Sequence, residues 1–167
     1  MEDERIQDEV TVSHRFAIDL GWFPDHMRSF VDLAQSRMCE SCQAKVGTET
    51  EERVPRPDAS GKVVFETVRT RYGSDPFAVI AECCSQKPEY HSSRLPVMEI
   101  VFRLFLANRN QPIALEDLTQ EVLEWVRPGD GRVINPTVID RLVLADEYYG
   151  IRQIEEALPA NLAATTA

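Results

Sequence analysis

The first predicted element comes from alternating positions near the start of the chain. Every second residue there lies on one side of an extended backbone: Val12, His14, Phe16, Ile18 and Leu20. This period predicts a half-buried strand, although the four-residue spacing of Val12, Phe16 and Leu20 also suits the start of a helix. Residues 1–10 are mostly charged, and we expect them to be disordered.

A stripe of apolar residues predicts a helix over residues 25–38. Its members recur with helical spacing and are Met27, Phe30, Val31, Ala34 and Met38. Such a stripe faces a protein core. The helix is expected to bring Cys39 and Cys42 to its C-terminal end.

The next stretch has the composition of a β-hairpin followed by a short helix. Polar and β-branched residues lie on both sides of a loop at 55–61 that contains Pro and Gly, which predicts a hairpin within residues 43–72. Asp75 and Pro76 suit the N-cap and first position of a helix. That helix is expected to end at a second cysteine pair, Cys83 and Cys84.

Three helices and a short strand are predicted for the rest of the chain. Residues 95–108 are apolar on nearly every side, which predicts a buried helix. A second helix follows Pro112, and a third begins at Asn135 and Pro136 and stops before Gly150. Residues 151–154 suit a strand, and residues 155–167 are expected to form a frayed tail.

This order of elements over residues 95–154 is similar to that of a winged helix-turn-helix domain. The residues that carry the resemblance are 111–118, at the entry to the second helix, and 135–137, at the entry to the third. Two features depart from the pattern: the turn between these helices is longer than usual, and no second wing strand follows residue 154. The resemblance implies a small domain that binds either DNA or protein.

The expected fold is therefore α+β and mainly helical, in two parts. Residues 11–93 would form a metal-stapled N-terminal lobe that carries the hairpin 43–72. Residues 94–154 would form the winged-helix-like three-helix domain.

The net charge of −10 works against a nucleic-acid partner. Acidic residues outnumber basic ones on both sides of residue 93, so duplex DNA would be repelled unless basic residues gather in space. In the predicted third helix, Arg141 stands among Asp140, Asp146 and Glu147. The residues that could contact an anion are Arg69, Arg71, Arg132 and Arg141.

The strongest chemical signal is the pair of cysteine motifs. Cys39 and Cys42 form a C-x-x-C sequence, and Cys83 and Cys84 follow about forty residues later. Four thiolates are a common ligand set for structural zinc, and His91 is an alternative ligand in place of one of the adjacent cysteines. An iron–sulfur cluster, a disulfide or redox pair, and ordinary buried thiols are the alternatives.

The remaining features bear on partners and compartment. The sequence lacks a long apolar run or a basic-then-apolar leader, so we expect a cytoplasmic protein without membrane contact, whose thiols stay reduced. Tyr148 and Tyr149 suit either an interface or a cap on the third helix. The leading hypothesis is a non-enzymatic structural-zinc protein that binds proteins, including its own copies. A metal-dependent DNA-binding regulator is the alternative, and a metalloenzyme is the third.

Overall fold

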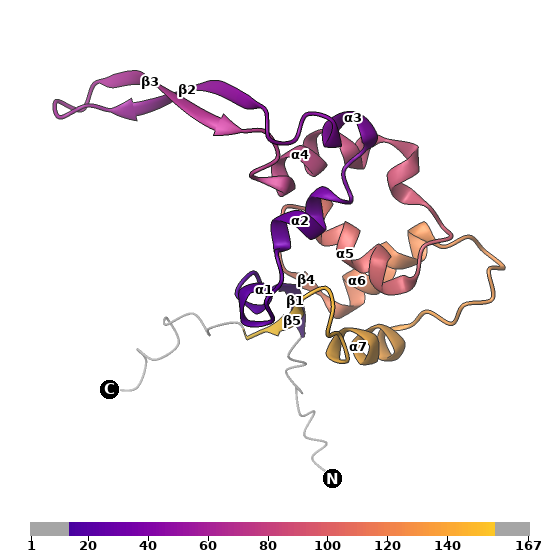
Figure 1. Cartoon of the computed structure of the whole chain (residues 1–167). Coiled ribbons are helices and arrows are strands. Elements are labelled where there is room, and N and C mark those ends of the chain that lie inside the picture. Colours follow the sequence, from indigo (N-terminus) through magenta and orange to yellow (C-terminus); the bar gives the residue numbers. More distant parts are fainter. Residues whose placement is uncertain (1–13, 156–167) are drawn as a thin grey trace, which may run out of the picture.

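The computed structural model describes residues 14–155 and has an α+β fold (Figure 1). The predicted disorder at 1–10 and nearly all of the predicted tail at 155–167 lie outside these residues. In chain order the elements are β1 (Arg15–Ile18), α1 (Trp22–Asp25), α2 (Phe30–Gln35), α3 (Glu40–Gln43), β2 (Glu49–Pro57), β3 (Val63–Arg71), α4 (Pro76–Glu82), two 3-10 helices η1 (Cys84–Gln86) and η2 (Pro88–His91), α5 (Val97–Ala107), β4 (Ile113–Ala114), α6 (Leu115–Trp125), α7 (Pro136–Leu144) and β5 (Ile151–Ile154).

The predicted strand near the start of the chain is confirmed as β1, which lies at the centre of a three-stranded sheet. It pairs antiparallel with β4 on one side and with β5 on the other. Phe16, Ala17 and Ile18 are all buried, so the strand is covered on both faces and is not half-buried as the alternation predicts, and Leu20 is 47% exposed. The sheet thus joins a segment assigned to the N-terminal lobe with two strands assigned to the C-terminal domain. The predicted boundary between residues 93 and 94 stays a prediction.

Helix α5 is the buried centre of the fold, as its apolar sequence predicts. It packs against α4, α6 and β1. Ile100, Val101, Phe102, Phe105 and Leu106 have no solvent-exposed surface. Burial of this kind contributes about 25 cal/mol for each Å² of apolar surface removed from water, so α5 accounts for a large share of the hydrophobic stabilisation.

The single helix predicted over residues 25–38 is wrong. The chain forms two short helices, α1 and α2, separated by Met27, which has a positive φ of 54°. Ser29 explains the break, because its hydroxyl accepts a hydrogen bond from the backbone N–H of Asp32 and so begins a new helix. Met27 is 97% exposed and does not belong to the core stripe.

Two further differences concern the C-terminal half. Residues 111–118, predicted as the entry to the second helix, contain a two-residue strand, β4, before α6 begins at Leu115. Tertiary pairing with β1 stabilises this strand, which is too short to give a periodic signal. The third helix is α7, and Asn135 caps it by accepting from the backbone N–H of Val138, as expected, but the helix ends at Leu144 and does not continue to Gly150.

The predicted hairpin is confirmed and stands away from the body of the molecule (Figure 1). We call residues 49–71, with strands β2 and β3 and the loop between them, the arm. Backbone hydrogen bonds close its base, from the N–H of Gly47 to the carbonyl of Tyr72 and from the N–H of Tyr72 to the carbonyl of Thr48. The arm joins the body of the molecule between α3 and α4, where the cysteines lie. We call this junction the root of the arm.

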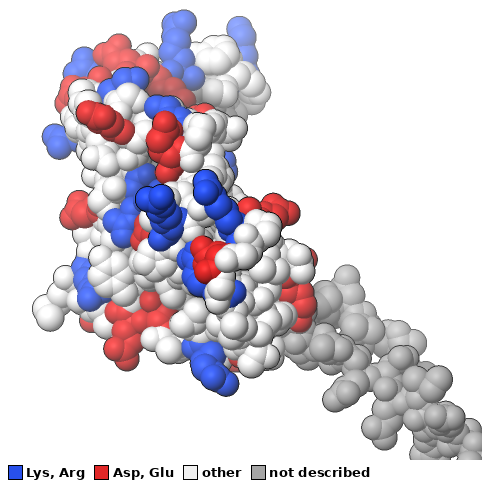
Figure 2. Space-filling model, turned by 90° about the vertical axis from the view of Figure 1, so that its right-hand side faces the viewer, with Lys and Arg blue, Asp and Glu red and all other residues white. Residues whose placement is uncertain are grey.

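Acidic and basic side chains are mixed on the molecular face shown in Figure 2. The arm and α7 lie at opposite ends of the molecule in Figure 1, so Arg69 and Arg71 do not join Arg141 in one basic surface. Within residues 14–155, no helix has both the length and the apolar character needed to cross a membrane.

Candidate metal centre

Each cysteine pair sits at a helix end at the root of the arm. Cys39 is the N-cap of α3 and Cys42 lies within that helix. Cys83 is the C-cap of α4, and Cys84 begins the 3-10 helix η1. The second pair therefore lies where the sequence predicts it, whereas the first pair lies in a new helix and not at the end of a long one. An extended backbone at Cys39, with ψ 159°, separates this new helix from the preceding chain.

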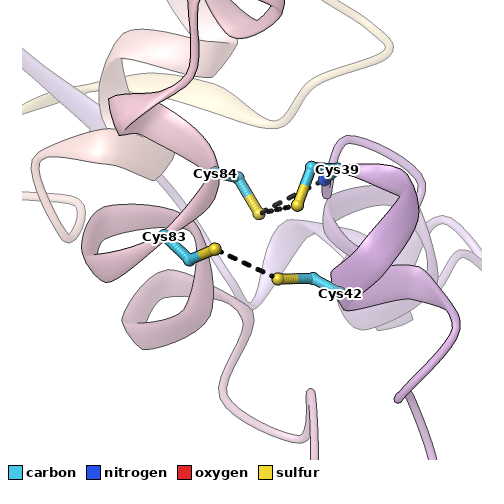
Figure 3. Close-up of side chains that lie close together, drawn as sticks. All are labelled: Cys39, Cys42, Cys83 and Cys84. Atoms are coloured by element: carbon cyan, nitrogen blue, oxygen red, sulfur yellow. Dashed lines mark hydrogen bonds between the residues drawn. The ribbon is translucent and has the colours of Figure 1, made fainter.

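The four sulfur atoms surround one point in space (Figure 3). All four Sγ atoms lie within 4.8 Å of one another. The Cys42–Cys83 and Cys39–Cys84 distances between sulfurs are 3.5 and 3.6 Å. Zn–S bonds of about 2.3 Å in a tetrahedron separate the sulfurs by about 3.8 Å. These distances are much longer than a disulfide bond of about 2.05 Å, and all four cysteines are free.

Neighbouring donors point at three of the sulfurs. The Lys87 ammonium lies 3.1 Å from the Cys39 sulfur, and the Tyr72 hydroxyl donates to the Cys42 sulfur at 3.3 Å. The backbone N–H of Cys39 donates to the Cys84 sulfur at 3.2 Å. Hydrogen bonds of this kind stabilise thiolates and orient them toward a metal ion.

The pKa values of three of the thiols, Cys39, Cys83 and Cys84, are shifted in different directions. Burial raises the pKa of Cys39, but hydrogen bonds from Ser41 and Lys87 outweigh it and lower that pKa to about 5. Burial raises the pKa of Cys84 to about 12. The hydrogen bond with Cys42 raises the pKa of Cys83. One thiolate in the group therefore disfavours ionisation of the others, and a cation at the centre would remove that repulsion.

One side of the site faces the protein core and the other is partly open to solvent. Cys42 and Cys84 are buried, whereas Cys39 and Cys83 are half-buried. An ion could therefore enter from the solvent side and be held against the core. The four cysteines form a site able to hold a metal ion, and it joins the two chain segments on either side of the arm.

His91, the alternative ligand, is placed elsewhere. Its Nε2 lies 2.6 Å from the carbonyl oxygen of Ser85, and its ring lies against Trp125 with the centroids 4.5 Å apart. The sulfur cluster is complete without it.

The other candidate residues have local roles. Tyr149 donates from its hydroxyl to Glu99 and packs against Phe102. These contacts favour the interpretation of Tyr149 as a core residue that caps the third helix over an interface residue. Tyr148 is 47% exposed and lies beside Arg28. Arg132 donates to Asp130 and to the backbone carbonyls of Ser93 and Leu95.

The arginines of the arm and of α7 lie on the surface. Arg69 pairs with Glu51 across the hairpin, Arg71 lies opposite Glu49, and Arg141 is exposed. Because the arm and α7 lie at opposite ends of the molecule (Figure 1), the four candidate arginines do not form one surface.

Sequence reasoning missed the residues that support the sulfurs. Lys87 and Tyr72 have no motif of their own, but Lys87 follows the second cysteine pair closely in the chain. It also missed Glu99, which is buried and bonded to two arginines. A lone carboxylate within the apolar segment 95–108 is the signal that indicates such a pairing.

The site thus defines a protein with a cluster of four cysteines at the root of a projecting hairpin. Comparisons with models of protein families, with curated proteins and with solved structures gave no match for this chain.

Proposed function

We propose that the four cysteines hold one structural zinc ion and that the chain is a non-enzymatic module that binds protein, including its own copies. The observation that carries the zinc proposal is the set of four sulfurs within 4.8 Å of one another. Such a set surrounds a single ion. A multi-iron cluster would spread its thiolates over several metals, so the iron–sulfur alternative is less well supported.

The ligand set favours a structural role over a catalytic one. Catalytic zinc keeps one coordination position open for water or substrate, whereas four protein ligands fill the tetrahedron. Here Cys39, Cys42, Cys83 and Cys84 supply all four ligands. The zinc would fix α3 against α4 and η1 and so hold the root of the arm. Four reduced thiols also fit a reducing compartment such as the cytoplasm.

The charge distribution supports a protein partner over DNA. The chain carries a net charge of −10. Arg132 is already engaged by Asp130 and backbone carbonyls. Arg141 belongs to α7, which lies at the opposite end of the molecule from the arm that carries Arg69 and Arg71 (Figure 1). A duplex-binding surface needs several basic side chains near consecutive phosphates. The winged-helix resemblance, which stays a prediction, is compatible with a protein-binding domain.

Elemental analysis tests the metal proposal directly. Protein purified without added metal should contain one zinc per chain, and the Cys42→Ser variant should lose it. His91→Ala is the matched control and should keep it. Absence of stoichiometric metal in the unaltered protein would overturn the proposal, and strong visible absorbance with bound iron would replace zinc with an iron centre.

Light scattering and a DNA mobility shift test the interaction proposal. The 19.0 kDa chain should run at a higher mass than a monomer. It should not shift random duplex DNA at low salt, where non-specific binding is strongest. A monomer that binds duplex with a steep salt dependence would favour the DNA-binding regulator instead.

A further inference from the structure

The hydrogen bonds of the arm show which backbone groups face outward. Bonds from the N–H of Asp58 to the carbonyl of Lys62 and from the N–H of Tyr72 to the carbonyl of Thr48, both 2.8 Å long, lie at the two ends of the hairpin. Hydrogen-bonded pairs alternate along an antiparallel ladder. Even-numbered residues therefore bond across the hairpin, and the N–H and C=O groups of odd-numbered residues point away from it.

The two outer edges differ in their ability to pair with another strand. On β2 the outward positions include Pro55 and Pro57, which have no N–H. Proline is common on edge strands because it cannot donate a hydrogen bond to a further strand. On β3 the outward positions are Val63, Phe65, Thr67, Arg69 and Arg71, and every one has an N–H. Within residues 14–155, neither edge has a third strand beside it.

The open edge of β3 also exposes apolar side chains. Val63 is 60% exposed, Val64 43% and Phe65 66%. The arm stands away from the body (Figure 1) and has little core of its own. A two-stranded hairpin is marginally stable alone, and a third or fourth strand stabilises it.

We infer that the outer edge of β3 pairs antiparallel with the same edge of a second copy, so that two arms form one four-stranded sheet around a two-fold axis. This inference rests on the self-association in the proposed function and names its surface. Only odd-numbered residues can meet in hydrogen-bonded pairs across the axis, since only their backbone groups face outward. The longest overlap places Thr67 opposite Thr67, Phe65 opposite Arg69 and Val63 opposite Arg71.

This register is self-complementary, which is why a second copy fits the edge. No two like charges lie directly opposite each other, and each arginine stem can cover an exposed apolar side chain of the other copy. Arg69 opposite Phe65 also suits a cation–π contact. The only outward carbonyl of β3 with a backbone partner is that of Arg71, which accepts from Ser74 at the end of the strand.

The charge of the arm further favours contact between two arms. The chain as a whole carries −10, so most approaches between two copies are repulsive. Within the arm, the acidic residues Glu49, Glu51, Glu52, Asp58 and Glu66 are balanced by Arg53, Arg56, Lys62, Arg69 and Arg71. The arm is therefore the neutral part of an acidic molecule.

A pair of proline variants tests the edge. Thr67 and Arg53 lie opposite each other in the hairpin, with their N–H groups on its two outer edges. Thr67→Pro should shift the full-length protein from twice the 19.0 kDa chain mass to the monomer in light scattering at equal concentration. Arg53→Pro is the matched control and should leave the dimer intact. A dimer that survives Thr67→Pro, or one that both variants abolish, overturns the inferred edge.

A cysteine pair tests the register. Residues in a hydrogen-bonded antiparallel pair have Cα atoms about 5.5 Å apart, within disulfide range. Thr67→Cys in the zinc-loaded protein should give a covalent dimer under mild oxidation, whereas Arg53→Cys should not. A dimer without this cross-link means another register or surface. A monomeric unaltered protein overturns self-association itself, while zinc content, measured separately, shows whether the metal proposal still stands.

Discussion

Arg37 and Glu99 form a two-point ion pair between the segment before the cysteine cluster and the central helix α5. Arg37 donates from Nε at 2.5 Å and from Nη2 at 2.9 Å to the two carboxylate oxygens. Arg103 and the Tyr149 hydroxyl donate to the same carboxylate at 3.0 and 2.9 Å. Because Arg37 lies two residues before Cys39, this carboxylate links the first cysteine pair to the hydrophobic core.

Replacing Glu99 should change the pH dependence of stability. Burial raises the pKa of Glu99, but hydrogen bonds from Arg37, Arg103 and Tyr149 outweigh it, so the pKa lies below the usual 4.5. A carboxylate with a lowered folded-state pKa stabilises the fold above its unfolded pKa, and this contribution is lost as pH falls through the folded value. Glu99→Gln should therefore cost about 3 kcal/mol at pH 7, because it leaves two arginines without their partner.

Denaturant unfolding from pH 7 to pH 3 measures this effect. The difference in free energy of unfolding between the unaltered protein and Glu99→Gln should shrink below about pH 4.5. Glu124→Gln, at an exposed position in α6, is the control. A difference that stays constant over this range would show that Glu99 does not titrate as its contacts indicate.

Lys87 should strengthen metal binding without being a ligand. Its ammonium lies 3.1 Å from the Cys39 sulfur and 3.1 Å from the Ser41 hydroxyl. Loss of such a supporting contact typically lowers metal affinity about 10–100-fold. Lys87→Ala should therefore weaken zinc binding within that range in competition with a chromophoric chelator. Lys62→Ala, in the hairpin loop, should leave the affinity unchanged, and equal affinities in the two variants would contradict the role of Lys87.

Metal removal should loosen the root of the arm before the core. The proposed ion joins α3 to α4 and η1, and the free energy of metal binding adds to the stability of the fold it closes. A chelator should lower the melting temperature and speed hydrogen exchange at Gly47 and Tyr72, whose N–H groups close the hairpin base. Amides of α5 should remain protected at moderate temperature. Identical exchange with and without chelator would mean that no ion holds this root.

Truncation of the central helix should be severe. Phe102 has no exposed surface and packs against Tyr149 with ring centroids 5.0 Å apart. Phe102→Ala should lower the free energy of unfolding by about 3–5 kcal/mol because of lost burial and the cavity left behind. Leu144→Ala, at a 61% exposed position in α7, is the control and should change it by less than about 1 kcal/mol. Equal melting temperatures would contradict the central position of α5.

The elements that sequence reasoning found are those with strong local signals. The apolar run at 95–108, the Asp75–Pro76 helix start and the Asn135 cap each depend on residues close together in the chain, and α5, α4 and α7 follow them. The helix expected over 25–38 failed because apolar spacing does not register the cap that Ser29 forms with Asp32. Strand β4 is two residues long and exists through its pairing with β1, far away in the sequence.

The sequence by itself determined the two cysteine pairs, the hairpin between them and the acidity of both halves. Only the tertiary structure brought the four sulfurs within 4.8 Å of one another and placed His91 outside that cluster. It alone placed Lys87 and Tyr72 against the sulfurs and Glu99 against Arg37, two residues before Cys39. It also decided that the arginines at 69, 71, 132 and 141 do not form one surface. The physical reason is that ligand geometry and charge clustering depend on distances between residues far apart in the chain, whereas periodicity and capping depend on near neighbours.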